Sequence, residues 1–197
     1  CHLRGDRRHI QERDLKLLRQ VIVTKLNLEM AATEEMLKVA REVKPDTVSL
    51  VPESPEEITT QGGLEVINQK EHLTSYIQEM KQAGIKVSIF VDPLENQIKA
   101  CQAVGADLIE INTGKYADAG SEKERQANLE EVRQAAVFAA RLGLEVHAGH
   151  GLDYHNVQPI VDIREISELS IGFAIVARAA MVGLTQAVRE MMELLQK

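Results

Sequence analysis

Three histidines gather in the segment VHAGHGLDYH, residues 146–155. His147, His150 and His155 follow H-x2-H-x4-H spacing, and Gly149 and Gly151 flank the middle one. Histidines ligate metals and transfer protons near neutral pH, so both chemistries are open here. Zinc sites, however, favour ligands at fixed helix or strand spacing, completed by Cys or a carboxylate. We therefore do not favour a three-histidine metal site, and we expect His147 to face the interior and His155 to lie at a helix start.

A phosphate site is the better explanation of the glycines in this segment. Glycine leaves main-chain N–H groups unshielded and lets the backbone approach a ligand closely. Further along the chain, IGFAIVARA places Gly172 at the start of the final predicted helix, and the N-terminus of a helix attracts anions. We expect Gly149, Gly151 and Gly172 to form one phosphate cradle.

Two carboxylates occupy predicted strands where they would face a common cavity. Side chains alternate between the two faces of a strand. In the strand predicted at 24–29, Glu29 therefore lies on the face that does not carry the leucines, and in the strand at 107–111 Glu110 lies on the corresponding inward face. Two partly desolvated carboxyl groups acquire separated pKa values, so one serves as a base and the other stabilises charge. The alternative is a buried salt bridge with Lys25 or an arginine.

The N-terminal segment HLRGDRRHI supplies cationic and titratable groups. Arg4 suits bidentate phosphate contact, and His2 and His9 suit proton transfer or anion binding. A solvated basic turn is the alternative. The segment at 52–63 is too long for a tight turn, which favours a substrate-facing loop with Thr59 and the following threonine as its hydroxyl groups.

Repeated βα units must position these groups. Short apolar runs of period two alternate with longer runs of period 3.6, which is typical of a parallel sheet. The predicted strands are 24–29, 47–51, 86–91, 107–111, 144–148 and 167–171. The predicted helices are 12–22, 33–43, 70–83, 94–104, 122–142, 155–162 and 175–195.

Two α/β architectures fit this alternation, an open doubly wound sheet and a (β/α)8 TIM barrel. No G-x-G-x-x-G follows the first strand, and the polar residues gather at strand ends. In barrel enzymes the catalytic groups lie at the carboxyl ends of the strands. We therefore predict a TIM barrel over residues 1–197 as a single domain.

Composition restricts the class of partner. The chain has 197 residues, of which 44% are hydrophobic and 27% are charged, with a formal net charge of -7. This acidic balance argues against binding to nucleic acid or an anionic membrane, and no apolar run approaches the roughly 20 residues of a membrane span. Cys1 and Cys101 are too few for a disulfide framework. We expect a cytoplasmic protein.

Six motifs in order resemble one known family. HLRGDRRHI, NLEMA, LVPE with TTQGGL, EINTGKYA, AGHGLDYHNV and IGFAIVARA are similar to the pyridoxine 5'-phosphate synthase family of vitamin B6 biosynthesis, from residue 2 to about residue 190. The resemblance implies a TIM barrel that condenses 1-deoxy-D-xylulose 5-phosphate with 3-amino-2-oxopropyl phosphate. The products are pyridoxine 5'-phosphate, phosphate and water, and the resemblance implies neither a metal nor another cofactor.

The resemblance also implies residue roles. It makes His2 and Glu29 bases, His150 the proton donor and Glu110 the transition-state stabiliser. Deoxyxylulose phosphate would be held by Arg4, His9 and Thr59, and aminooxopropyl phosphate by Gly151, Gly172 and Phe173. Many members carry His at the position of Phe173, so we expect binding there through the backbone. Dimers assembling into an octamer are the implied homo-oligomer.

Alternative functions stay open from the residues alone. They are another phosphate-binding barrel enzyme, such as an isomerase or an aldolase, a metal-dependent hydrolase and an inactive truncated copy. An aldolase needs a Schiff-base lysine at a strand end, whereas Lys25 begins its strand.

By comparison with the family pattern, we expect the chain to lack the first strand, the first helix and most of the second strand of the barrel. Exposed strand edges promote aggregation. We therefore predict that this chain alone is poorly soluble and inactive, whereas a chain extended by about 40–50 N-terminal residues, a typical βα length, is active. Purifying both forms and comparing their synthase activity tests this, and equal activity would contradict it.

Overall fold

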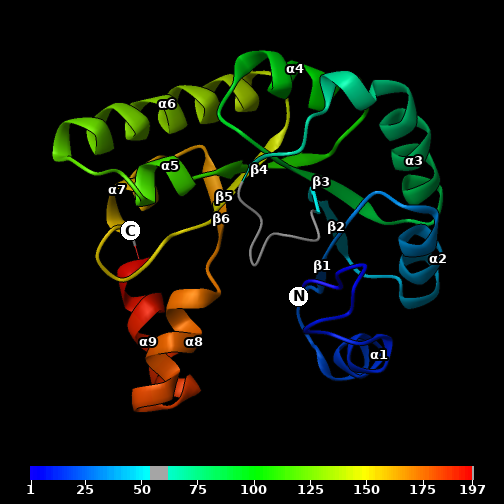
Figure 1. The fold of residues 1–197 in the computed structure, drawn as a ribbon, viewed down its shortest axis with the longest axis horizontal. Helices are drawn as coiled ribbons and strands as arrows, with labels where there is room; N and C mark the ends of the chain where they lie inside the picture. The colour runs from blue at the N-terminus through cyan, green and yellow to red at the C-terminus, as the bar shows by residue number, and fades with distance from the viewer. Residues whose placement is uncertain (54–61, 197) are drawn as a thin grey trace.

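Six strands and their covering helices follow from the two sequence periodicities. The computed structural model describes residues 1–53 and 62–196. In this part of the chain the strands form one parallel sheet that curls into an incomplete barrel, with α2, α3, α4 and α6 along its outer side (Figure 1). Thr59 and its neighbouring threonine lie outside the described residues.

The strands are β1 (Asn27–Met30), β2 (Thr47–Leu50), β3 (Lys86–Val91), β4 (Leu108–Asn112), β5 (Glu145–Gly149) and β6 (Ile166–Ser170). The helices are α1 (Glu12–Val21), α2 (Glu34–Val43), α3 (Lys70–Gln82), α4 (Glu95–Ala103), α5 (Gly114–Ala117), α6 (Glu122–Arg141), α7 (Gln158–Val161), α8 (Phe173–Val182) and α9 (Leu184–Leu194). A 3-10 turn, η1 (Ile67–Gln69), precedes α3.

The strand order identifies the fold class. Each strand pairs in parallel with the next one in the chain, in the order β1 to β6. A doubly wound sheet reverses its strand order at a switch point, so the barrel prediction is confirmed and the open-sheet alternative is wrong. Residues 1–3 run beside β1: the amide of Leu3 donates to Glu29 at 3.1 Å, and the amide of Glu29 donates to Cys1 at 2.8 Å.

Several predicted boundaries need correction. The first strand begins at Asn27 and the helix expected at 155–162 is reduced to α7. The helix expected at 175–195 is two helices, because Gly183 between α8 and α9 has a φ of 83° that a helix does not contain. The short helix α5 was not expected.

The main hydrophobic core lies between the sheet and its outer helices. On α6 the buried positions are Leu129, Val132, Ala135, Ala136 and Ala139, which lie on one side of the helix, as expected for a helix with one apolar face. They join a cluster that includes the fully buried Ile109 of β4. Burial of a large apolar side chain contributes about 1.5–3 kcal/mol, so this layer holds the sheet in its curled form.

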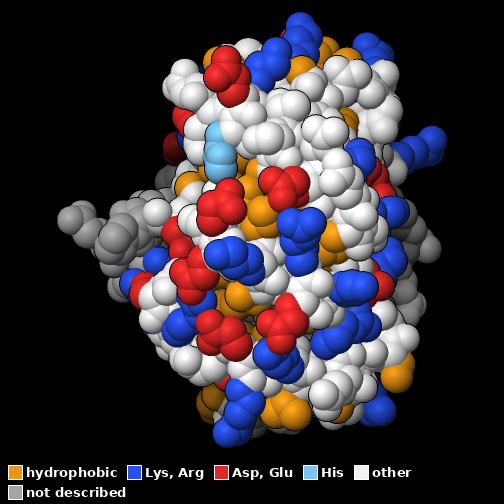
Figure 2. All heavy atoms as spheres, turned by 90° about the vertical axis from the view of Figure 1, so that its right-hand side faces the viewer, with side chains coloured by type: hydrophobic (Ala, Val, Ile, Leu, Met, Phe, Trp, Pro, Cys, Tyr) orange, Lys and Arg blue, Asp and Glu red, His pale blue; other side chains and the backbone are white. Residues whose placement is uncertain are grey.

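The outer surface over the helices carries charges of both signs. Figure 2 shows basic and acidic side chains interleaved on the face it views, without an area of one sign alone. Arg41 on α2 pairs with Glu79 on α3 at 3.0 Å, and Lys16 pairs with Glu42 at 2.6 Å. Such a face offers no continuous basic track to a phosphate backbone.

None of the helices in the described part of the chain combines the length and the apolar character that a membrane crossing requires.

Candidate active site

Parallel strands bring their carboxyl ends to one rim of the sheet, and the candidate residues meet there. A cavity of about 1040 Å³ opens at this rim. Its walls include every described residue to which the family resemblance gives a role, namely His2, Arg4, His9, Glu29, Glu110, His150, Gly151, Gly172 and Phe173. Thr59 lies outside the described residues. The structure therefore brings together groups that span almost the whole chain.

Glu110 is the most deeply buried acid in this cavity. Its side chain extends from β4, and the residue is 5% exposed. Burial, and then the negative charge of Glu29, raise the pKa of Glu110 to about 7, while the hydrogen bond from the Ser170 hydroxyl at 2.9 Å acts in the opposite direction. A carboxyl group with this pKa exists in both protonation states near neutral pH, which suits proton transfer or charge stabilisation. Glu110 is not in a salt bridge with Lys25, which pairs with Glu168 instead.

Gly149 is required by the position of Glu110. A Cβ atom at Gly149 would lie 2.2 Å from Oε1 of Glu110 and 2.9 Å from Cβ of Ser170. The residue is buried at the end of β5, where its carbonyl accepts hydrogen bonds from both the amide and the hydroxyl of Thr113. The expectation of an unshielded Gly149 amide in an open loop is therefore wrong, and its role is to leave room for a carboxylate.

His150 is held in a backbone conformation that histidine rarely adopts. Its φ is 83°, in the left-handed region. The hydroxyl of Thr113 lies 2.7 Å from both the Gly149 and the His150 carbonyl oxygens, which ties β4 to this loop. The imidazole packs against Gly114, where a Cβ would lie 2.9 Å from its ring. Tertiary contacts thus offset the strain and aim the ring at the cavity.

The segments that follow β5 and β6 form one end of the cavity. Gly151 has a φ of 74°, and a Cβ there would meet that of Ala117 at 2.6 Å, so only glycine fits without displacement. Gly172 precedes α8 as its N-cap, and no side chain caps the helix. The first amides of α8 are consequently available to an anion. Phe173 is 87% exposed.

The N-terminal segment forms the opposite wall. His2 is close to two carboxylates: Nδ1 lies 3.6 Å from Glu29 and Nε2 lies 3.0 Å from Glu53. Arg4 is only 3% exposed and its Nε lies 3.5 Å from Asp6. A buried guanidinium in the cavity wall is suited to a phosphorylated ligand.

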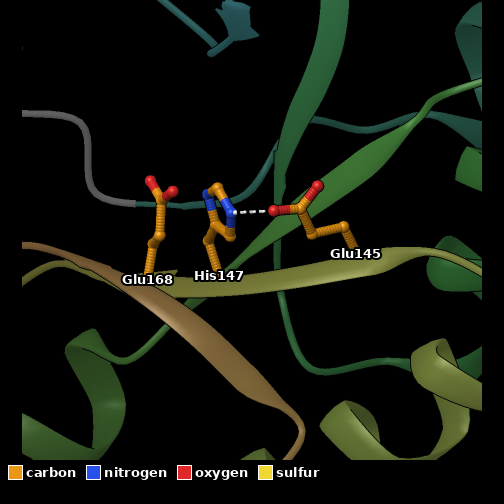
Figure 3. Close-up of side chains that lie close together, drawn as sticks. All are labelled: Glu145, His147 and Glu168. Carbon is orange, nitrogen blue, oxygen red and sulfur yellow. Dashed lines mark hydrogen bonds and ion pairs between the residues drawn. The ribbon is translucent and has the colours of Figure 1, made fainter. Parts of the chain in front are cut away.

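The three-histidine group separates in the structure. His147 points from β5 toward Glu145 at 3.2 Å, beside Glu168 of β6 (Figure 3). Within the described residues this Glu145, His147 and Glu168 group is the set that has metal-ligand spacing, and Lys25 bonds Glu168 at 2.8 Å. His155 lies in the turn before α7 and contributes to the cavity wall.

Sequence reasoning missed several groups at the rim. Glu53 lies three residues after the end of β2. This position after a strand could have identified it as a candidate site residue. Asp92 directly follows the end of β3. It accepts hydrogen bonds from Asn112 and from the amide of Gly63. Its partners lie in other βα units, which local sequence does not specify.

Solved structures with the same fold are barrels that differ in sequence. The KGPDC of Streptococcus mutans aligns with a TM-score of 0.62 and 12% identity over 93% of this chain and 78% of that one. A 3-hexulose-6-phosphate synthase aligns with a TM-score of 0.61 and 13% identity over 93% and 81% of the two chains. At such identity the likeness establishes the fold alone.

The fold is that of a TIM barrel, and its cavity brings several acid-base groups together around the N-terminus of α8. Residues 1–197 match the family model described as pyridoxal phosphate biosynthesis protein PdxJ, and the chain belongs to this family. The pyridoxine 5'-phosphate synthase of Prochlorococcus marinus is 56% identical over 98% of this chain and 79% of its own length. That of Trichlorobacter lovleyi is 50% identical over 100% and 82%. The family resemblance drawn from the six motifs is confirmed.

Replacing Gly149 by Ala displaces the Glu110 carboxylate, because the new methyl group occupies its place. We expect product formation to fall by about 10²-fold, the typical contribution of one acid-base group. Steady-state kinetics measure this. Gly120→Ala is the control, since a Cβ there meets Glu124 at an ordinary 3.7 Å. Equal activity of Gly149→Ala and the unsubstituted protein would contradict the assigned role.

Replacing Glu110 by Gln changes how stability depends on pH. The pKa of Glu110 rises from 4.5 to about 7 on folding, so between these values the unfolded chain loses the proton first and stability falls as pH rises. The stability of Glu110→Gln relative to the unsubstituted protein should therefore increase from pH 4.5 to pH 7, by up to about 3 kcal/mol. Urea unfolding of both proteins at about pH 5 and about pH 8 measures this change in relative stability, because the two pH values bracket most of the interval between the two pKa values. A difference independent of pH would contradict the shift.

Proposed function

We propose that the protein forms pyridoxine 5'-phosphate from 1-deoxy-D-xylulose 5-phosphate and 3-amino-2-oxopropyl phosphate, releasing phosphate and water. The observation that carries the proposal is the family match over residues 1–197, with relatives named pyridoxine 5'-phosphate synthase at 50–56% identity. The site supports it, because the described residues to which the family resemblance gives a role line one cavity.

The condensation is a series of proton transfers. Forming an imine removes water, losing phosphate requires a base to take a proton from carbon, and closing the ring requires further transfers, so several acids and bases are needed. His2 and Glu29 act as the bases and His150 as the proton donor. Glu110, with its pKa near 7, stabilises charge that develops in the transition state.

Two phosphorylated substrates need two anion subsites. Arg4 and His9, with Thr59 from the segment outside the described residues, hold deoxyxylulose phosphate. Gly151 and the amides at Gly172 and Phe173 hold aminooxopropyl phosphate. The free N-terminus of α8 supports the second subsite, and the buried guanidinium of Arg4 supports the first.

The main competing chemistry within phosphate-binding barrels is a Schiff-base aldolase. Such an enzyme needs an unprotonated lysine at the carboxyl end of a strand. Lys25 precedes β1, at the other end, and its ion pair with Glu168 at 2.8 Å raises the pKa of its ammonium group. These facts favour acid-base condensation over Schiff-base chemistry at Lys25.

A cytoplasmic homo-oligomer is also part of the proposal. The apolar side chains of Phe173, Met181 and Leu184 on α8 and α9 are 87%, 82% and 61% exposed, and contiguous exposed apolar surface is typical of contact sites. Dimers that assemble into an octamer follow from the family resemblance.

Substitution of the two principal groups tests the reaction. Incubating the purified protein with both substrates should yield pyridoxine 5'-phosphate, measured by chromatography. Glu29→Gln and His150→Asn should each lower kcat by about 10²-fold or more, because each removes one acid-base group.

Glu79→Gln is the control, since Glu79 pairs with Arg41 on the outer helices. Absence of product with the unsubstituted protein would contradict the function. Normal turnover in Glu29→Gln or His150→Asn would contradict the role of that residue.

A further inference from the structure

Glu53 is placed to control the chemistry of His2 although no step of the proposed reaction uses it. It follows β2, and its side chain is 13% exposed. One carboxylate oxygen lies 3.0 Å from Nε2 of His2, and the other accepts the amide of Gly5 at 2.9 Å. Both oxygens of Glu53 are therefore engaged with the N-terminal segment.

Counting protons determines which nitrogen of His2 carries hydrogen. A carboxylate only accepts hydrogen bonds, and a backbone amide only donates them. The Nε2 atom of His2 must therefore be the donor to Glu53. In the neutral ring the lone pair then lies on Nδ1, which is 3.6 Å from Oε2 of Glu29.

We propose that Glu53 is a positioning residue that fixes His2 as its Nε2–H tautomer, so that the lone pair of Nδ1 lies beside Glu29 and the two groups act together as one proton acceptor. A single proton placed between Nδ1 and the Glu29 carboxylate is attracted by both groups. When Nδ1 takes a proton from the substrate, the ring becomes an imidazolium held between two carboxylates. Transfer of that proton to Glu29 leaves a neutral ring and a carboxylic acid, so each proton taken is accounted for.

This arrangement explains why two proposed bases are neighbours. Bases that act independently do not need to touch, whereas His2 and Glu29 lie next to each other on adjacent backbone segments joined by a β-bridge. The N–H···O contact with Glu53 orients the ring, as a carboxylate does for a catalytic imidazole in hydrolase triads. The catalytic part of the proposal rests on the proposed function, but the tautomer of His2 does not.

Glu53→Gln makes a sharp test because it inverts the hydrogen bonds with little change in shape. The side-chain oxygen of the introduced glutamine must accept the Gly5 N–H, which leaves its NH₂ group toward Nε2 of His2. Nε2 must then become the acceptor, so the proton moves to Nδ1 and faces Glu29. Glu53→Asp keeps an acceptor-only group and should keep the Nε2–H tautomer.

Nitrogen-15 NMR of histidine-labelled protein reads the tautomer directly, and His2→Asn identifies the His2 signals. We expect Nε2–H in the unsubstituted protein and in Glu53→Asp, and Nδ1–H in Glu53→Gln. Finding Nδ1–H in the unsubstituted protein, or no change in Glu53→Gln, would overturn the proposal whether or not the protein makes product.

The kinetic arm tests the positioning role. With both substrates, Glu53→Gln should lower kcat by about 10²-fold with KM nearly unchanged, because the altered group does not bind substrate. Glu53→Asp should recover part of kcat, and Glu79→Gln should match the unsubstituted protein. A rise in KM at constant kcat would overturn the positioning role, whereas absence of product in every form would contradict the proposed function alone.

Discussion

Parallel pairing of consecutive strands is the constraint on which the rest of the structure depends. Because β1 to β6 run in the same direction and in chain order, their carboxyl ends share one rim. Glu29, His150 and Gly172 are far apart in the chain, yet they line the same cavity. The outer helices and the apolar layer beneath them keep the sheet curved. This curved sheet forms the back wall of the cavity.

The buried carboxyl group of Glu110 dominates the electrostatics at that rim. Removal from water and proximity to Glu29 disfavour its charged form. The fold accommodates it by leaving Gly149 without a side chain and by directing the Ser170 hydroxyl toward it. In the loop after β5, the backbone of His150 is in the left-handed region, and the hydroxyl of Thr113 contacts its carbonyl oxygen. One group of contacts between β4, β5 and β6 thus fixes the positions of both Glu110 and His150.

Sequence periodicity predicted the six strands and the facing of Glu29 and Glu110 into a common cavity, because alternation along a strand is a local property. It failed where a distant contact decided the outcome. Gly149 looked like a ligand-facing glycine but is packed against Glu110. The local sequence did not indicate that Asp92 accepts a hydrogen bond from Asn112 on the next strand. One predicted C-terminal helix became two at Gly183, whose φ of 83° a periodic apolar pattern does not reveal.

The sequence by itself determined the parallel α/β architecture, the family and the residue types at the carboxyl ends of the strands. These follow from local periodicity and from short motifs whose order is preserved along the chain. Only the tertiary structure decided which groups act on one another. His2 meets Glu53 from 51 positions away, and Ser170 meets Glu110 from 60 positions away. Hydrogen bonds depend on atomic distance and direction, and the folded sheet alone sets both for residues so far apart in the chain.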